Sequence, residues 1–151
     1  MEDFPIIEAD PLQIRQLFQN LLSNALKFTH PERTPEIWVK TALITSEQAK
    51  NVASFLHERD YWCLQVQDNG IGFDNKYAER IFNIFQRLHG RTQFEGTGIG
   101  LAICQKIAEN HQGFITADGQ KGVGAKFTVF LPLLHSQSFE ICIKFPEQLP
   151  Y

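Results

Sequence analysis

The sequence has 151 residues, of which 43% are hydrophobic and 21% charged, and its formal net charge is -3. These values are typical of one globular domain, and the acidic balance argues against a nucleic-acid-coating surface. The three cysteines, Cys63, Cys104 and Cys142, form no C-x-x-C pair, so neither structural zinc nor a disulfide framework is expected.

The chain also lacks the sequence features of a membrane or secreted protein. Its N-terminus has no basic segment followed by an apolar one, and no run approaches the ~20 apolar residues of a transmembrane helix. We therefore expect a cytoplasmic domain with reduced thiols and no transmembrane segment in this chain. It is either free or the cytoplasmic end of a larger sensor.

The first predicted element is a helix over residues 12–28. Apolar residues recur in it at helical spacing, and Asp10 and Pro11 supply an N-cap and a first helical residue. A polar stripe borders the apolar one and consists of Gln16, Asn20, Asn24 and Lys27. This stripe is either a solvated face or the rim of a cleft.

Residues 36–45 and 61–67 are rich in β-branched and aromatic side chains, which predicts two strands. The polar segment 46–60 between them has a helical tendency. In the second strand, the alternation that puts Leu64 and Val66 on one face puts Asp68 on that face too. A carboxylate that continues an apolar face requires a polar partner.

The second half of the chain begins with a predicted helix over residues 77–88, followed by a loop. A further helix is expected over residues 100–112, with Gly113 as the residue that ends it. Residues 114–118 and 125–131 then predict a β-hairpin. The order of helix, strands, helices and strands predicts an α+β two-layer sandwich.

The glycines at positions 96, 98 and 100 stand immediately before the helix 100–112. They form either a tight structural turn or a phosphate cradle. The second alternative arises because glycine N–H groups and a helix N-terminus can both face an anion. No Gly-Lys-Ser/Thr ends the motif, so it is not a Walker A loop.

Five separated segments together match the pattern of one family. They are QNLLSNALKF (19–28), DNGIGF (68–73), IFNIFQRL (81–88), GTGIGLAI (96–103) and GVGAKFTVFLPL (122–133). In this order they resemble the N box, first glycine box, F box, second glycine box and last glycine segment of sensor histidine kinases. The wider group includes type II topoisomerases, Hsp90-like chaperones and mismatch-repair ATPases. Within it, the chain most resembles phytochrome-like sensor kinases.

The resemblance implies the Bergerat ATP-binding fold, in which helices cover one face of a mixed β-sheet. It implies a catalytic domain over residues 1–133 and leaves 134–151 as a tail. In that tail Phe139, Ile141 and Ile143 alternate as in a strand, which would pair either with the sheet edge or with a neighbouring chain.

For the adenine end, the resemblance implies that Asp68 accepts a hydrogen bond from the adenine amino group. Gly70 and Gly72 would let the backbone pass close to the base. Guanine presents a carbonyl oxygen at that position, so an acceptor there would select ATP. The alternative is that Asp68 caps a turn.

For the phosphate end, the resemblance implies that Asn24 ligates Mg²⁺ and that Lys27 lies near the phosphates. Asn20 occupies a candidate catalytic position where ATP-hydrolysing relatives carry glutamate. Because asparagine cannot act as a base, the chain is expected to donate its phosphoryl group to another nucleophile instead of activating water.

Residues 83–97 correspond to the ATP lid. Phe82 and Phe85 would anchor it, and Phe85 would also border the nucleotide. Arg87 and Arg91, with His89 between them, would contact the β- and γ-phosphates, although each is also compatible with a solvated loop charge. The resemblance puts further residues on the phosphate side of the site: Gly96, Thr97, Gly98, Gly100 and Leu101.

These expectations describe a protein-histidine kinase fragment that uses ATP and Mg²⁺ and is monomeric alone. No histidine-bearing hairpin is recognisable, and His57 lacks the pattern that follows an acceptor histidine. The implied partners are an upstream dimerisation and phosphoacceptor domain and a response regulator receiver domain, with no nucleic acid. The alternatives are a non-catalytic nucleotide-binding docking module and a hydrolysing GHKL-type ATPase.

Overall fold

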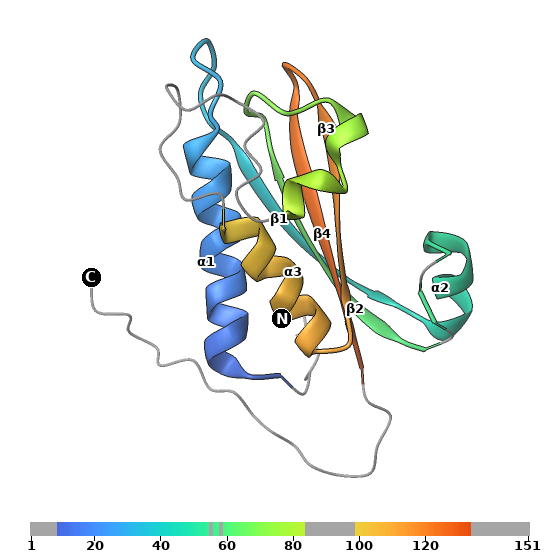
Figure 1. Ribbon diagram of the computed structural model, residues 1–151. Helices are drawn as coiled ribbons and strands as arrows, with labels where there is room; N and C mark the ends of the chain where they lie inside the picture. The colour runs from blue at the N-terminus through green and yellow to red at the C-terminus, as the bar shows by residue number, and fades with distance from the viewer. Residues whose placement is uncertain (1–8, 55, 58, 84–98, 134–151) are drawn as a thin grey trace, which may run out of the picture.

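The computed structural model describes residues 9–54, 56–57, 59–83 and 99–133 (Figure 1). Three α-helices, two single-turn 3₁₀ helices and four strands follow one another along this part of the chain. In chain order they are α1 Pro11–Lys27, β1 Ile37–Ile44, α2 Ser46–Val52, β2 Tyr61–Asp68, η1 Asn75–Tyr77, η2 Arg80–Phe82, α3 Gly100–Asn110, β3 Phe114–Gln120 and β4 Gly124–Pro132.

The four described strands form one sheet in the order β1-β2-β4-β3, and every neighbouring pair is antiparallel. The mixed sheet implied by the resemblance is therefore not what these strands form. The connection through α3 does make β2 and β3 run in the same direction. However, β4 lies between them and pairs antiparallel with both, so no parallel pair arises.

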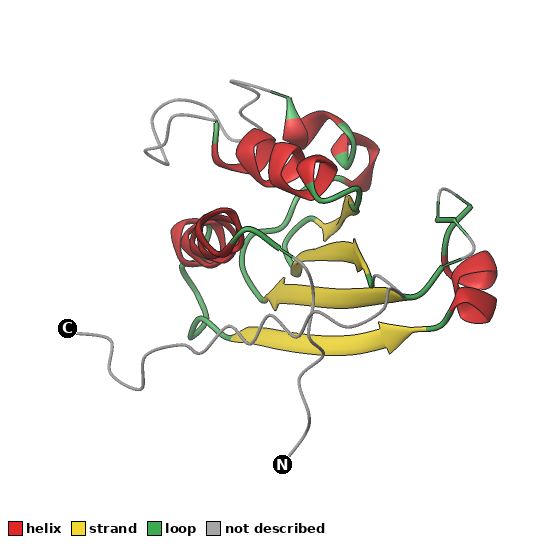
Figure 2. Ribbon diagram, turned by 90° about the horizontal axis from the view of Figure 1, so that it is seen from below, coloured by secondary structure: helices red, strands yellow, loops and turns green. Residues whose placement is uncertain are grey.

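Helices α1 and α3 cover one face of this sheet, so the predicted two-layer α+β architecture is confirmed (Figure 2). Alternate residues of β2 face the helices and join Leu17 and Leu21 of α1 and Cys104 of α3 in the main core. Trp62, Leu64 and Val66 are the apolar members of that β2 face, and Asp68 ends it, as the alternation predicted.

The other face of the sheet has a smaller core at one end only. There Tyr61, Cys63 and Phe130 pack against Ala49 of α2 and Leu56 of the segment that follows. Thr45 and Gln48 form a capping box that starts α2, so the helical tendency of the connector is confirmed over seven residues.

The N-terminus of α1 is capped as predicted. The Asp10 carboxylate accepts hydrogen bonds from the N–H groups of Leu12 (3.0 Å) and Gln13 (3.4 Å), and Pro11 takes the first helical position. This cap fixes where α1 begins, and the packing of Leu17 and Leu21 in the core orients its polar stripe.

Helix α3 ends at Asn110, two residues before the predicted end, and the residue that terminates it lies one position earlier than predicted. Gln112, not Gly113, has the left-handed conformation, with φ of 59°. The N–H of Gly113 donates to the Ala108 carbonyl (2.8 Å) and that of Gln112 to the Glu109 carbonyl (2.9 Å), which is a Schellman motif. Gly113 is needed for another reason, because a Cβ there would lie 2.1 Å from the Phe130 carbonyl oxygen.

The predicted helix over residues 77–88 is not formed as such in its described part. Residues 75–82 contain the two 3₁₀ turns, and Phe82 is buried at their end. That Phe82 anchors a lid stays a prediction. The β3–β4 strands are longer than predicted, so that only residues 121–123 remain as the turn. The tail 134–151 lies outside the described residues, and its extra strand stays a prediction.

No helix in the described ranges is long and apolar enough to span a bilayer.

Candidate functional site

The carboxylate of Asp68 ends β2 on the helix-covered face and is only 8% exposed. Its Oδ1 accepts hydrogen bonds from the N–H groups of Gly70 (2.9 Å) and Ala125 (3.2 Å). Among the described residues no group donates to Oδ2. One oxygen therefore caps the turn, as the alternative prediction had it, and the other has no donor from the described part of the chain.

Burial governs the protonation of this group. It raises the pKa of Asp68, and the two hydrogen bonds from Gly70 and Ala125 offset the effect only in part. An ionised carboxylate that has lost hydration gains most when a donor reaches its unused oxygen. The arrangement is thus suited to an N–H-bearing ligand.

Gly70 and Gly72 are required by the protein backbone that surrounds their turn. A Cβ on Gly70 would lie 2.1 Å from the Phe28 carbonyl oxygen. Gly72 has φ of 62°, and a Cβ there would lie 2.1 Å from the Gln120 carbonyl oxygen. The turn is consequently wedged between the end of α1 and the β3–β4 hairpin. Close approach to a base, the sequence-based reason for these glycines, stays a prediction.

The polar stripe of α1 borders the start of α3. The Asn20 Oδ1 accepts from Gln16 Nε2 (2.8 Å), and Asn20 Nδ2 donates to the Gly100 carbonyl oxygen (3.2 Å). Both ends of the Asn20 amide are therefore engaged within the protein. At this position the stripe is an interhelical contact and not merely a solvated face.

Asn24 lies one turn further along α1 and is half-buried, and Lys27 at the end of the helix is exposed. No described residue hydrogen-bonds to either side chain. Within the described ranges the Asn24 amide oxygen thus has no competing donor. That Asn24 ligates a metal and that Lys27 presents its charge to an anion stay predictions. The described residues contain no cluster of three or more His, Cys, Asp or Glu side chains that could hold a metal.

Gly100 is the first residue of α3, and the described residues leave open space where its Cβ would be. Leu101 is partly buried and packs on the main core. The remaining predicted site residues lie outside the described ranges: Phe85, Arg87, His89, Arg91, Gly96, Thr97 and Gly98.

Two residues at the site were not singled out from the sequence. The side chain of Asn69 bonds to the loop that precedes β1, and Arg33 of that loop bonds to the carbonyl of Gly70. The Asp-Asn-Gly sequence is a turn signal that could have identified Asn69. Arg33 stands in a loop without periodicity, and no sequence signal identifies it.

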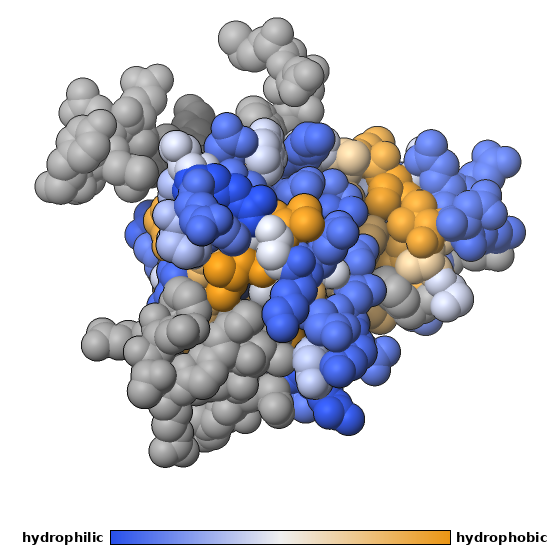
Figure 3. Space-filling view, turned by 90° about the horizontal axis from the view of Figure 1, so that it is seen from above, coloured by the Kyte–Doolittle hydropathy of each residue, from blue (hydrophilic) through white to orange (hydrophobic). Residues whose placement is uncertain are grey.

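The end of the molecule that carries this loop and the β3–β4 turn is seen in Figure 3. Hydrophilic residues predominate on that surface, with smaller apolar patches between them.

Comparison with known proteins agrees with this geometry. Residues 9–135 match the family described as histidine kinase-, DNA gyrase B- and HSP90-like ATPase. The chain belongs to this family. Phytochrome-like protein Cph1 of Synechocystis is 42% identical over 129 residues, and sensor histidine kinase RcsC of Escherichia coli is 36% identical over 141 residues. The aligned segments cover 85% and 89% of the chain but only 15% and 13% of those relatives.

Two solved structures share the fold. The mycobacterial sensor histidine kinase MprB superposes with a TM-score of 0.65 at 21% identity, covering 83% of the chain and 76% of that structure. Full-length ShkA in complex with AMPPNP gives a TM-score of 0.67 at 25% identity, covering 89% of the chain and 24% of that structure. The chain is thus a histidine-kinase-type ATPase domain, as the five sequence segments predicted.

Proposed function

We propose that this domain binds Mg–ATP and transfers the γ-phosphoryl group to a histidine side chain on a separate domain. Membership of the ATPase family and similarity to sensor histidine kinases support the proposal. The single observation that carries it is the buried Asp68 carboxylate, with Oδ1 held by two backbone N–H groups and Oδ2 without a donor among the described residues.

Asp68 would recognise the base. Its Oδ2 would accept a hydrogen bond from the adenine amino group, and that bond would replace the hydration that burial removes. Guanine presents a carbonyl oxygen instead, and two facing acceptors repel each other. A guanine nucleotide would also leave the carboxylate unpaired, so it should bind more weakly.

Asn24 and Lys27 would serve the phosphate end. A neutral amide oxygen with no other partner among the described residues fits Mg²⁺, which takes most of its ligands from phosphates and water. When bound, the ion supplies charge neutralisation between the phosphates. Lys27, together with Arg87 and Arg91, would stabilise the charge of the transferring group. Phe85, Gly96, Thr97, Gly98, Gly100 and Leu101 would enclose the nucleotide.

Asn20 favours transfer to a side chain over hydrolysis. Its amide is not a base, and both of its ends are bonded within the protein. The nucleophile would be a neutral imidazole nitrogen from a partner domain, which forms a bond to the γ-phosphorus as the bond to the bridging oxygen breaks and ADP leaves. The task of this domain is then positioning and charge stabilisation.

The partners follow from the same reaction. They are a dimerisation domain that carries the acceptor histidine and, after it, the receiver domain of a response regulator. Both are expected in the cytoplasm, and the length of the curated relatives leaves room for the first in the same polypeptide.

The test is calorimetric titration of Mg–ADP and Mg–GDP into the wild-type domain and Asp68→Asn. We expect saturable binding of ADP, much weaker binding of GDP, and loss of ADP binding in the variant. In the variant the amide nitrogen would take the place of Oδ2, so that one donor would face another, the adenine amino group. A folded wild-type domain that binds no ADP would overturn the proposal.

A second assay tests transfer. The domain and radiolabelled ATP are mixed with a separately made histidine-bearing hairpin from a sensor kinase. Acid-labile label should appear on the hairpin and not on this chain. Steady-state phosphate release without a phosphoprotein would instead identify a hydrolysing ATPase.

A further inference from the structure

The loop between α1 and β1, residues 28–36, is bound to the turn that follows Asp68. The Asn69 side chain accepts from the Glu36 N–H at Oδ1 (2.8 Å) and donates from Nδ2 to the Thr34 carbonyl (2.9 Å). The Asn69 N–H donates to the Glu36 carbonyl oxygen (3.2 Å). Three hydrogen bonds of Asn69 therefore attach the turn to the α1–β1 loop.

Arg33 of the same loop connects the turn after Asp68 to the β3–β4 turn. Its Nη2 donates to the carbonyl oxygen of Gly70 (3.3 Å) and also to that of Gly122, in the β3–β4 turn. The Gly122 N–H in turn donates to the Ile71 carbonyl oxygen (2.7 Å). A guanidinium nitrogen carries two hydrogens, so a single Nη2 can serve both carbonyls. The α1–β1 loop and the β3–β4 turn lie at the same end of the molecule in Figure 1.

The segments that Arg33 joins are those that hold the Asp68 carboxylate. Of the two N–H groups bonded to Oδ1, one belongs to Gly70 and the other to Ala125, three residues after Gly122. If the Asp68–Gly70 turn and the β3–β4 hairpin separate, Oδ1 loses one of its two donors. Arg33 opposes that separation because its nitrogen bonds to both segments at once.

We propose that Arg33 is a positioning residue for base recognition, which fixes the direction of the Asp68 carboxylate without touching the nucleotide. The proposal rests on the proposed function, since it assumes that Asp68 Oδ2 meets the adenine amino group. A carboxylate held in place before the ligand arrives loses less entropy on binding, and its acceptor direction separates adenine from guanine more sharply.

The discriminating measurement is the ratio of the Kd values for Mg–GDP and Mg–ADP in Arg33→Ala. We expect the ADP Kd to rise by about fivefold to tenfold, the equivalent of one ordinary intramolecular hydrogen bond. The GDP Kd should change much less, so the ratio should fall. A loss of folded protein would raise the apparent Kd of both nucleotides by the same factor and leave the ratio unchanged.

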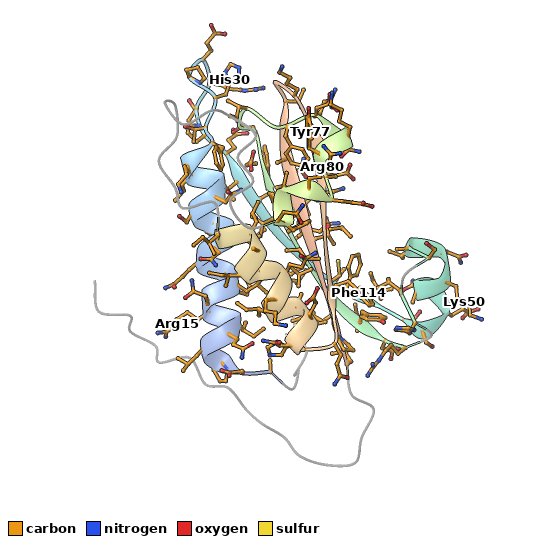
Figure 4. All side chains as sticks on the ribbon, viewed as in Figure 1. Arg15, His30, Lys50, Tyr77, Arg80 and Phe114 are labelled. Atoms are coloured by element: carbon orange, nitrogen blue, oxygen red, sulfur yellow. The ribbon has the colours of Figure 1, made fainter. Side chains whose placement is uncertain are left out.

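Two further variants sharpen the test. Arg15→Ala removes the same charge from an exposed position near the far end of α1, away from the loop marked by His30 (Figure 4). It should leave both Kd values unchanged. Arg33→Lys keeps the charge and a donor but lacks the planar fork, and should give an intermediate ratio. If Arg33→Ala does not fold, the Arg33→Lys ratio decides.

The outcomes separate the two proposals. If the wild type selects ADP and folded Arg33→Ala selects it equally well, the role of Arg33 is overturned and the proposed function stands. If Arg33→Ala does not fold, an unchanged ratio in Arg33→Lys overturns it in the same way. Absence of ADP binding by the wild type overturns the proposed function and, with it, this inference.

Discussion

Asn20 of α1 donates through Nδ2 to the carbonyl oxygen of Gly100, the first residue of α3, across 3.2 Å. The bond joins the two segments that resemble the N box and the second glycine box, which lie 80 residues apart in the sequence. The start of α3 is therefore fixed to the helix that carries Asn24 and Lys27. The asparagine that we propose disfavours hydrolysis thus also links α1 to the start of α3.

Replacing Asn20 with Asp tests this contact, since the side chain keeps its size but loses the donor. A carboxylate oxygen would then face the Gly100 carbonyl oxygen, and we expect the free energy of unfolding to fall by about 1–2 kcal/mol. Urea denaturation followed by circular dichroism measures the change. Gln16→Ala, which removes an exposed hydrogen bond to the same residue, should cost less than about 0.5 kcal/mol. Equal stability of Asn20→Asp and wild type would contradict the assignment.

Asp68→Asn should lose nucleotide binding yet gain stability at neutral pH. Burial holds the Asp68 pKa above its ordinary value of 3.8, so between 3.8 and the raised pKa the folded state binds more protons than the unfolded state. Stability due to this group is present below that window and is lost as the pH rises through it. At pH 7 the ionised carboxylate destabilises the fold, and a neutral amide at the same position avoids that effect.

Thermal unfolding from pH 3 to pH 8 measures this difference. The variant should unfold at a higher temperature than wild type at pH 7, and the gap should close as the pH drops through the window. Glu79→Gln, which changes an exposed carboxylate that makes no side-chain cap hydrogen bond, is the control. A variant less stable than wild type at pH 7 would mean that the two backbone hydrogen bonds outweigh the burial.

Cys104 should be chemically inert in the folded domain. Burial is the main reason that its pKa is raised to about 12, and its Sγ lies 3.8 Å from the Leu17 carbonyl oxygen in the α1–α3 contact. At pH 8 only about one thiol in ten thousand would be the reactive thiolate. Iodoacetamide at pH 8 should leave Cys104 unmodified in native protein and label it in urea, as read by peptide mass spectrometry. Rapid labelling of native protein would indicate that the two helices separate readily.

The sequence pattern predicted the architecture well because burial follows periodicity. The apolar stripe of residues 12–28 and the alternation of β2 specify which face of each element is covered, and so they located Asp68. Strand order was less predictable. The insertion of β4 between β2 and β3 depends on contacts between distant segments, and the pattern of a single strand does not reveal its neighbours.

The same limit applies to Arg33. Its two acceptors, Gly70 and Gly122, are 37 and 89 residues away, and both are backbone carbonyls. Any residue type offers such a carbonyl, so nothing in the sequence marks them. The charged side chains of the proposed lid, in contrast, were recognised only through the family resemblance, and their contacts stay a prediction.

Gln112 and Gly113 give the last prediction, because neighbouring substitutions should act in opposite directions. Gln112 is sterically strained in the left-handed conformation, so Gln112→Gly should stabilise the domain by up to about 1 kcal/mol, less the entropy that glycine adds to the unfolded chain. Gly113→Ala would drive a methyl group into the Phe130 carbonyl oxygen and should destabilise it by about 2–3 kcal/mol. Urea denaturation of both variants provides the comparison. If glycine were required at position 113 for its backbone conformation, Gly113→Asn should be tolerated better than Gly113→Ala. If the requirement is steric, the larger asparagine side chain should be at least as harmful as alanine.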